Sequence, residues 1–410
     1  MLTLNYTYRI EPTADQKQQM LSWLETCRRL YNRCLRDLKD WLNSRKCSVD
    51  YCSINKEYIM SPDIPFPSYI EQKKQLTQWK KTNPYLKEVY SQVNQDVVKR
   101  MHNTWSAFKR RGFGFPRFKK YGQYRSFYYP QFKKNPLTGY QIKLPMIGNV
   151  KINQHRPIPE GFKIKAVRIV SRARNTKWYA VITIQSNVSV PDVIPYGRAI
   201  GIDIGLENFL STSDGFKVRP ARFFLDLQSE LKSLQRKASR KKRSARSEVS
   251  SELGRTKQKR SKNYEKAQIK VAKLHHKIAN TRKNFHLQVA HELCDHADMI
   301  FVEDLVFSVS AKGFLGKNMH RSSFGQFRTL LSWVCWKRGK YFAEVDHKYT
   351  SQICPHCGAH TGKKELKYRV HNCPECGYST SRDIASAQVI KQRGLEYIYI
   401  KGSPNLAEKL

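Results

Sequence analysis

The sequence predicts a mixed α+β chain of several domains. Leu2 to Ile10 alternate apolar and polar side chains, as a half-buried strand does, and apolar residues at helical spacing follow from Thr13. Short apolar runs typical of buried strands return near residues 200 and 300, on either side of a long, highly charged helical region. With 410 residues, the chain is long enough for two or three domains that each bury a core.

The first 190 residues predict a β-barrel-like unit with a helical insertion at about residues 13–112. Thr13 and Gln16 have the spacing of a capping box, so a helix should begin there, and a second long helix is expected after Pro84. Residues 61–67 (SPDIPFP) predict a proline-broken loop, and residues 190–197 (VPDVIPYG) predict a linker. Further strands are expected at residues 141–144, 149–152, 163–170 and 178–184.

The chain is strongly basic. Lysine and arginine total 75 against 33 acidic residues, a formal net charge of +42. Self-repulsion on this scale destabilises a compact chain, so a polyanionic partner is expected, and nucleic acid is the simplest one. An anionic membrane is the competing interpretation, but no apolar run approaches the roughly 20 residues of a membrane span. The first residues lack a signal-peptide pattern, so we expect a protein of the cytosol or nucleoid of a prokaryotic cell.

Residues 112–134 (GFGFPRFKKYGQYRSFYYPQFKK) interleave aromatic rings with cations. Such a segment either follows a nucleic-acid backbone and stacks on bases, or is an edge strand with a solvated face. The net charge of the chain favours nucleic-acid binding. The expected contacts are the cations Arg117, Lys119, Lys120 and Arg125 and the rings Phe113, Phe115 and Tyr121.

A second basic segment is expected to form a helical hairpin at about residues 224–295, with Gly254 as a candidate break. Charge runs are often only solvated helix surfaces, but the density of one sign here favours a hairpin that faces nucleic acid. The expected contacts are Arg236, Arg240, Lys241, Lys242 and Arg243.

Three acidic residues are candidates for a catalytic metal site. Asp203 lies within the apolar strand of GIDIG, Glu303 near the end of MIFVED, and Asp383 at the start of a short helix in SRDIASAQVI. A charge beside a buried strand is costly unless it is paired or binds metal. Carboxylates from separate elements suit Mg²⁺ or Mn²⁺, and two such ions about 3.5–4 Å apart can hydrolyse a phosphodiester. Glu303 alone or Asp383 alone is more often a turn or cap residue, and the GIDIG pattern around Asp203 is short, so the prediction depends on all three together.

The cysteine pattern predicts a zinc site. Cys354 and Cys357 form one close pair, and Cys373 and Cys376 form another after 15 intervening residues. Two such pairs suit a closed, structural Cys₄ zinc site far better than four free thiols. The other six cysteines are scattered, and we interpret them as reduced thiols.

In this order the motifs resemble the transposon-encoded TnpB family, the OrfB-type proteins of bacterial insertion sequences and relatives of compact type V CRISPR effectors. GIDIGLENFLSTSDG, IFVEDL and TSQICPHCG…CPECG…SRDIASA carry the resemblance, together with YRIEPTADQK and GFPRFKK. The resemblance implies a wedge-like barrel with a helical recognition insertion over residues 1–190 and an RNase H-like, RuvC-type nuclease over 197–349. It also implies a zinc ribbon at 350–379, a final RuvC segment at 380–398 and a tail at 399–410.

The resemblance implies an RNA-guided DNA endonuclease, with Asp203, Glu303 and Asp383 as its catalytic acids and with Mg²⁺ (or Mn²⁺) and Zn²⁺ as cofactors. The expected partners are a guide RNA and a double-stranded DNA target beside a short flanking motif, and a monomer is favoured. The last motif departs from the family pattern DRDxNAA, because Ser381 stands for the first Asp and Ala385 for the Asn. A guide-RNA-dependent DNA-binding regulator that does not cut is therefore the alternative.

Overall fold

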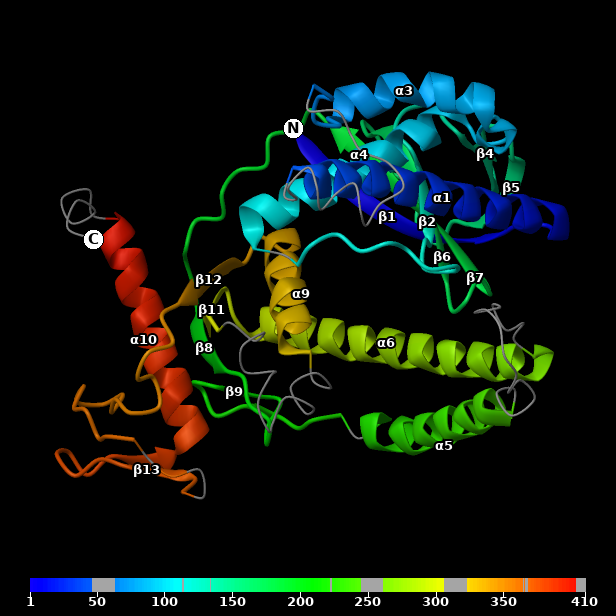
Figure 1. Cartoon of the computed structure of the whole chain (residues 1–410). Helices are drawn as coiled ribbons and strands as arrows, with labels where there is room; N and C mark the ends of the chain where they lie inside the picture. The colour runs from blue at the N-terminus through cyan, green and yellow to red at the C-terminus, as the bar shows by residue number, and fades with distance from the viewer. Residues whose placement is uncertain are drawn as a thin grey trace. The chain divides into compact units, whose positions relative to one another are not determined.

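The computed structural model describes residues 1–45, 63–112, 114–132, 134–221, 223–244, 261–305, 323–363, 365 and 368–402 (Figure 1). The chain divides into two compact units, Met1–Val190 and Pro191–Leu410. Phe113 and Gly254, two residues singled out from the sequence, lie outside the described residues, and so does the side chain of Arg243.

The first unit is built on a seven-stranded sheet in which every pair of neighbours is antiparallel. The central strand β1 (Leu2–Glu11) pairs with β7 (Lys177–Ser186) along almost its whole length, from Leu2 opposite Ser186 to Ile10 opposite Trp178. The strand order is β2-β6-β7-β1-β5-β4-β3, an open sheet in the described residues. The remaining strands are β2 (Ser126–Tyr129), β3 (Leu137–Thr138), β4 (Gln141–Leu144), β5 (Gly148–Asn153) and β6 (Lys163–Arg172).

The helices of the first unit are α1 (Ala14–Ser44), α3 (Tyr69–Thr82), the short 3₁₀ helix η1 (Pro84–Leu86) and α4 (Ser91–Arg111). The predicted capping box is confirmed, because Thr13 and Gln16 exchange both of its hydrogen bonds at the start of α1. α1 packs on α4 and on the sheet, where the ring centroid of Trp23 lies 5.4 Å from that of Phe127. The predicted strands of this unit are confirmed, whereas α3 was not expected from the sequence.

The second unit has a five-stranded sheet in the order β10-β9-β8-β11-β12. The three strands β8, β11 and β12 are parallel, and β9 and β10 continue the sheet as antiparallel neighbours. The predicted strands at GIDIG and MIFVED are confirmed, although Asp203 is the last residue of its strand rather than an interior one. The bounds are β8 (Ala199–Asp203), β9 (Leu210–Thr212), β10 (Lys217–Val218), β11 (Met299–Glu303) and β12 (Tyr341–Val345).

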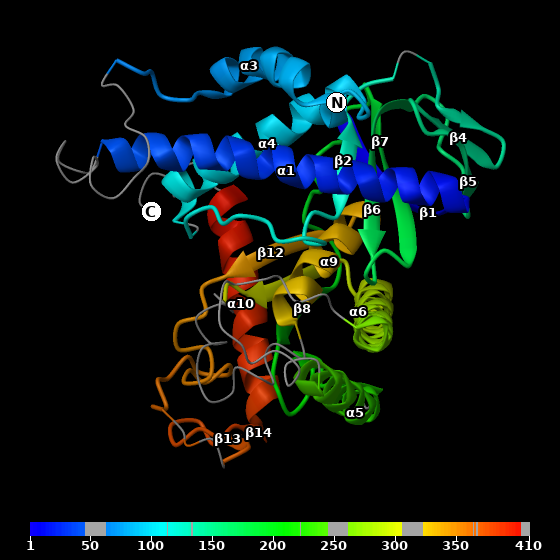
Figure 2. The same ribbon diagram turned by 45° about the vertical axis from the view of Figure 1, so that its right-hand side comes forward.

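Helices cover both faces of this sheet. On one face, α6 (Lys262–His296) and α9 (Phe324–Lys337) bury Leu293 and Phe327 against Ile200 and Ile300 of the strands. On the other face lies α10 (Arg382–Gly402), a helix of 21 residues rather than the short one expected (Figure 2). The basic helix α5 (Phe223–Ser244) packs along α6, so a helical pair is present in the expected region.

The mixed α and β class predicted from the sequence is confirmed by these two sheets and their helices. None of the helices in the described part of the chain is both long and apolar enough to span a membrane.

Candidate active site and metal centre

Two of the three predicted acids end neighbouring parallel strands. Ile202 of β8 pairs with Val302 of β11, and the next residue of each strand is Asp203 or Glu303. The residues before them are buried, whereas both acids are half-buried. Since parallel strands present their carboxyl ends at one edge of a sheet, the register brings these two carboxylates to the same edge.

Asp383 reaches the same region from α10, where it lies in the first helical turn. This helix packs directly on β8, the strand that ends in Asp203. Asn208, in the loop between β8 and β9, donates from Nδ2 to Oδ2 of Asp383 over 3.2 Å. The three acids predicted from the sequence therefore come from separate elements that are packed together.

The electrostatics of Asp203 show that the acids influence one another. Burial raises the pKa of Asp203 well above its usual value, and the carboxylates of Glu303 and Asp383 raise it further. The pKa of Glu303 is also raised by burial, against the hydrogen bond that it accepts from Thr350. A crowded set of carboxylates of this kind is stabilised by a cation, and hard oxygen donors suit a divalent one.

In the described residues, the cysteine cluster is the only group of three or more His, Cys, Asp or Glu side chains close enough together to share a metal ion. The carboxylate oxygens of Asp203, Glu303 and Asp383 therefore do not all lie within 4.8 Å of one another. A pair of metal ions about 3.5–4 Å apart allows a wider spacing of the carboxylates, because each carboxylate then needs to bind only one of the two ions.

The four predicted cysteines do come together. Their sulfur atoms all lie within 4.8 Å of one another, with Sγ–Sγ distances of 3.7 Å from Cys354 to Cys376 and 3.6 Å from Cys357 to Cys373. A tetrahedral zinc ion with Zn–S bonds of about 2.3 Å separates its sulfur ligands by about 3.8 Å. The geometry thus fits a Cys₄ zinc site, in which no position is left for water or substrate.

Each cysteine pair sits on a tight turn that requires glycine. Gly358 and Gly377 follow the second cysteine of each pair with φ angles of 74° and 71°, a conformation that L-residues rarely adopt. Their amides donate back to the carbonyls of Cys354 (2.9 Å) and Cys373 (3.0 Å). These turns hold both cysteines of a pair on the same side.

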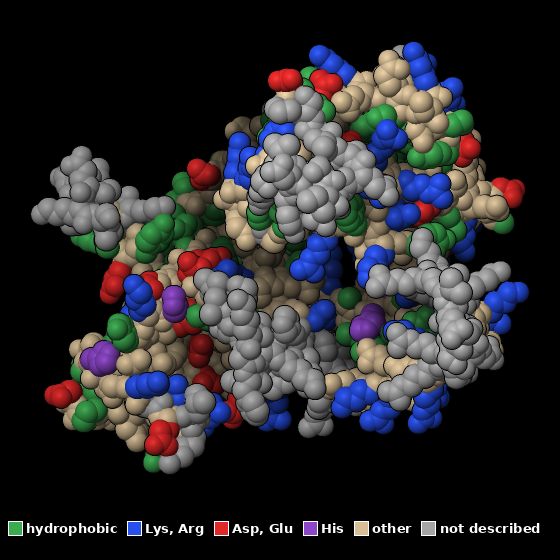
Figure 3. Space-filling model, in the orientation of Figure 1, with side chains coloured by type: hydrophobic (Ala, Val, Ile, Leu, Met, Phe, Trp, Pro, Cys, Tyr) green, Lys and Arg blue, Asp and Glu red, His purple; other side chains and the backbone are tan. Residues whose placement is uncertain are grey.

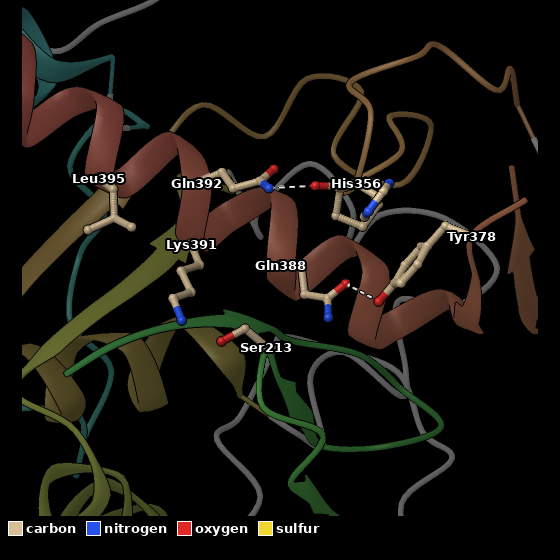
Figure 4. Close-up of a pocket in the computed structure, with 8 residues that line it drawn as sticks. Ser213, His356, Tyr378, Gln388, Lys391, Gln392 and Leu395 are labelled. Atoms are coloured by element: carbon tan, nitrogen blue, oxygen red, sulfur yellow. Dashed lines mark hydrogen bonds between the residues drawn. The ribbon is translucent and has the colours of Figure 1, made fainter. Parts of the chain in front are cut away.

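The segment that carries the two cysteine pairs (described residues 350–363, 365 and 368–379), here called the cysteine module, is anchored on α10 (Figure 4). Gln392 Nε2 donates to the carbonyl of Pro355 over 2.5 Å, and the Tyr378 hydroxyl donates to Gln388 Oε1 over 2.9 Å. The ring of His356 stacks on that of Tyr378 with a centroid distance of 5.7 Å. These side chains line a hollow of about 320 Å³. Both cysteine turns are thus attached to the helix that begins beside Asp383.

The basic helix α5 presents an exposed row of cations. Lys and Arg side chains gather over this helix (Figure 3), and a hollow of about 470 Å³ lies between them, lined by Lys232, Arg236 and Arg240. The predicted nucleic-acid contacts on this helix whose side chains are described, Arg236, Arg240, Lys241 and Lys242, are all exposed.

The aromatic and basic segment after α4 is coil from residue 114 to Arg125, and its residues 126–129 form β2, an edge strand of the seven-stranded sheet. Asn32 of α1 fixes it by bonding both the amide (2.7 Å) and the carbonyl (2.9 Å) of Lys119, and Lys119 itself is half-buried. Phe115 packs against Trp105 and Phe108, with centroid distances of 5.6 and 5.2 Å. By contrast, Tyr121 is 82% exposed, and the predicted contacts Arg117, Lys120 and Arg125 are also exposed.

Comparisons with known proteins show which families the chain resembles. Three family profiles match it in order: the OrfB helix-turn-helix domain at residues 1–47, the OrfB "probable transposase" at 252–312 and the "Cas12f1-like, TNB domain" at 324–390. Two of these profiles describe OrfB domains, so the chain is similar to transposon-encoded proteins of the OrfB type. The chain thus resembles the TnpB family of such proteins, as its motifs predicted.

Two curated relatives match most of the chain. The putative RNA-guided DNA endonuclease InsQ of Escherichia coli (strain K12) is 28% identical over 369 residues, which cover 86% of this chain and 83% of that protein. A putative RNA-guided DNA endonuclease of Streptomyces pristinaespiralis is 24% identical over 361 residues, covering 86% of this chain and 80% of that one.

Similar solved structures include a Cas12f1–sgRNA–target DNA complex (12% identity, TM-score 0.31, 95% of this chain and 99% of that one). Another is the mini-RNA-guided endonuclease CRISPR-Cas_phi3 (11% identity, TM-score 0.37, 96% of this chain and 92% of that one).

Proposed function

We propose that the protein is an RNA-guided DNA endonuclease, which hydrolyses DNA paired to a guide RNA beside a short flanking motif. Both curated relatives bear the name of this activity, and their matches extend over most of the chain. The proposal rests on three acids, Asp203, Glu303 and Asp383, that come from the packed elements β8, β11 and α10. The carboxylates of Glu303 and Asp383 raise the pKa of Asp203, so the three charges act on one another.

The catalytic step is assigned to a RuvC-like site in which these three carboxylates hold Mg²⁺ or Mn²⁺. Bound divalent ions supply an activated water and stabilise the leaving oxygen of the phosphodiester. Glu303 and Asp383 each accept a hydrogen bond from a neutral side chain, so their charge remains available for a cation. Burial and the carboxylates of Glu303 and Asp383 raise the pKa of Asp203, and a bound divalent cation would stabilise its ionised form.

The four cysteines are assigned to a structural zinc ion. Their closed shell takes no part in the chemistry, and its role is to keep both turns folded against α10. In this assignment, residues 350–379 form the zinc ribbon, and the nuclease consists of residues 197–349 and 380–398.

The basic surfaces are assigned to the guide RNA and the target DNA. Residues 1–190, with the helical insertion at about 13–112, form the wedge-like recognition part, and α5 and α6 form a second nucleic-acid surface. Base pairing reads the target sequence in such a complex, while cations hold the phosphate backbones.

A cleavage assay tests the proposal. The protein is purified with its guide RNA and incubated with target DNA and Mg²⁺. Asp203→Asn keeps the side-chain shape but removes the charge, so it should abolish cutting and leave target binding intact. Asp192→Asn is the matched control, because Asp192 is exposed near the start of the second unit and should not affect cutting. If the wild type binds target but never cuts with any divalent ion, the non-cutting regulator replaces the endonuclease.

A further inference from the structure

Two of the three acids, Glu303 and Asp383, each accept a hydrogen bond from an uncharged side chain. Both of these donors lie in segments other than the strands and the helix that carry the three acids. The hydroxyl of Thr350 donates to Oε1 of Glu303, and Thr350 is only 5% exposed. The amide of Asn208 donates to Oδ2 of Asp383 over 3.2 Å. Thr350 lies just before the first cysteine pair, and Asn208 lies in the loop between β8 and β9.

The loop that carries Asn208 is fixed at several points. Glu207 forms an ion pair of 2.7 Å with Arg369 of the cysteine module. The amide of Phe209 donates to the carbonyl of Val218 over 2.7 Å, and the Phe209 side chain is buried in the core. Asn208 is therefore presented to Asp383 by an ordered segment on both of its sides.

Neutral donors suit a site that must bind cations. Carboxylates that face one another repel and turn apart unless something holds them. A lysine or arginine in the same place would neutralise the carboxylate and compete with the metal, whereas a hydroxyl or an amide occupies one lone pair and leaves the charge in place. Thr350 and Asn208 meet this requirement for Glu303 and Asp383.

We propose that Thr350 and Asn208 are positioning residues, which orient Glu303 and Asp383 for divalent-cation binding. This inference rests on the proposed function and deepens it. Neither residue touches substrate in the proposal; each acts through the acid that it contacts.

The test measures Mn²⁺ binding by electron paramagnetic resonance on the purified protein–RNA complex, together with the Mg²⁺ dependence of single-turnover cleavage. Thr350→Val keeps the branched shape without the hydroxyl, and Asn208→Leu keeps a similar shape without the amide. Each should weaken Mn²⁺ affinity by about 10- to 100-fold, as the loss of a ligand's hydrogen-bond partner does elsewhere. Thr350→Ser should restore affinity to near the wild-type value.

Thr329→Val is the matched control, since the Thr329 hydroxyl bonds the Gly325 carbonyl on α9. It should bind Mn²⁺ as the wild type does. Melting temperature and zinc content report on folding of the Thr350 variant, and Asn208→Leu tests the idea at a half-exposed position. Unchanged Mn²⁺ affinity in both variants overturns the inference. If, in that case, Asp203→Asn still loses metal and cutting, the proposed function stands; if Asp203→Asn keeps both, the proposed function itself fails.

Discussion

Gly201 in β8 lies directly against the backbone carbonyl of Ala387 in α10. A β-carbon at position 201 would overlap that oxygen and also meet the backbone nitrogen of Lys391. Helix and strand can approach this closely only because residue 201 has no side chain. The contact lies two residues before Asp203 in the strand and one helical turn after Asp383 in the helix.

Gly201→Ala should therefore push α10 away from β8. Because the obstacle is rigid backbone, we expect a destabilisation of about 1–3 kcal/mol and a loss of cutting larger than the loss of folded protein. Thermal melting and single-turnover cleavage check both effects. Gly114→Ala is the control, because a β-carbon there meets nothing within 4 Å, and it should leave both quantities near wild type.

Zinc removal should disable cutting without preventing target binding. Cys373→Ser breaks the Cys₄ shell, which releases the turns that Gln388 and Gln392 hold against α10 and so displaces Asp383. Metal analysis should show less than one zinc per chain. Cys294→Ala alters a buried thiol outside the cluster and should retain the zinc. Full activity in a Cys373→Ser protein with confirmed zinc loss would contradict this prediction.

Local signals predicted many of the elements near the site. The alternation of Leu2–Ile10 and the capping box at Thr13 specify β1 and the start of α1 without help from the rest of the chain. α3 was missed although Ser68 and Glu71 carry a similar signal: the Ser68 side chain accepts from the Glu71 amide. The prolines at positions 62, 65 and 67 predict a loop, and the helix that begins directly after this loop was not predicted.

The site itself was only partly predictable, because hydrogen-bond partners depend on tertiary packing. The acids and cysteines stand out by residue type and spacing, but nothing in the local sequence indicates that Asn208 faces Asp383, 175 positions later. Thr350 contacts Glu303 for a similar reason, across a separation of 47 positions. The prediction that Asp203 lies in the interior of its strand was wrong, because Asp203 is the last residue of β8. At this strand end its carboxylate is close enough to Glu303 and Asp383 for their charges to raise its pKa.

A half-buried acid in the first unit, Asp37, gives a pH-dependent prediction. Burial raises the pKa of Asp37, against the charge of Arg33 and the hydrogen bond from Gln72. A carboxyl group whose pKa is raised by folding binds its proton more tightly in the folded protein than in the unfolded chain. The resulting stability is present at low pH and is lost as pH rises from the ordinary Asp pKa through the raised one.

Asp37→Asn should remove this dependence, because an amide oxygen can accept the same bond from Gln72 and does not ionise. We expect a gain of less than about 1 kcal/mol at neutral pH and a flatter stability profile above the ordinary Asp pKa. Chemical denaturation between acid and neutral pH measures both effects. Asp192→Asn, at an exposed position, should reproduce the wild-type profile; if Asp37→Asn does so too, burial of the Asp37 charge is not a cost to folding.

The exposed cations of α5 predict how salt affects binding. If Arg236 and Arg240 each contact a phosphate, replacing one with Gln should lower the slope of log affinity against log salt by about 0.7–0.9, because one fewer counterion is released. Fluorescence anisotropy with labelled nucleic acid over a range of salt concentrations measures the slope. Arg338→Gln makes the same change in net charge, but Arg338 is paired with Asp295 at 2.6 Å and should leave the slope unchanged. Equal slopes for wild type and both α5 variants would show that this helix faces solvent, and the guide and target would then have to lie on other basic surfaces of the chain.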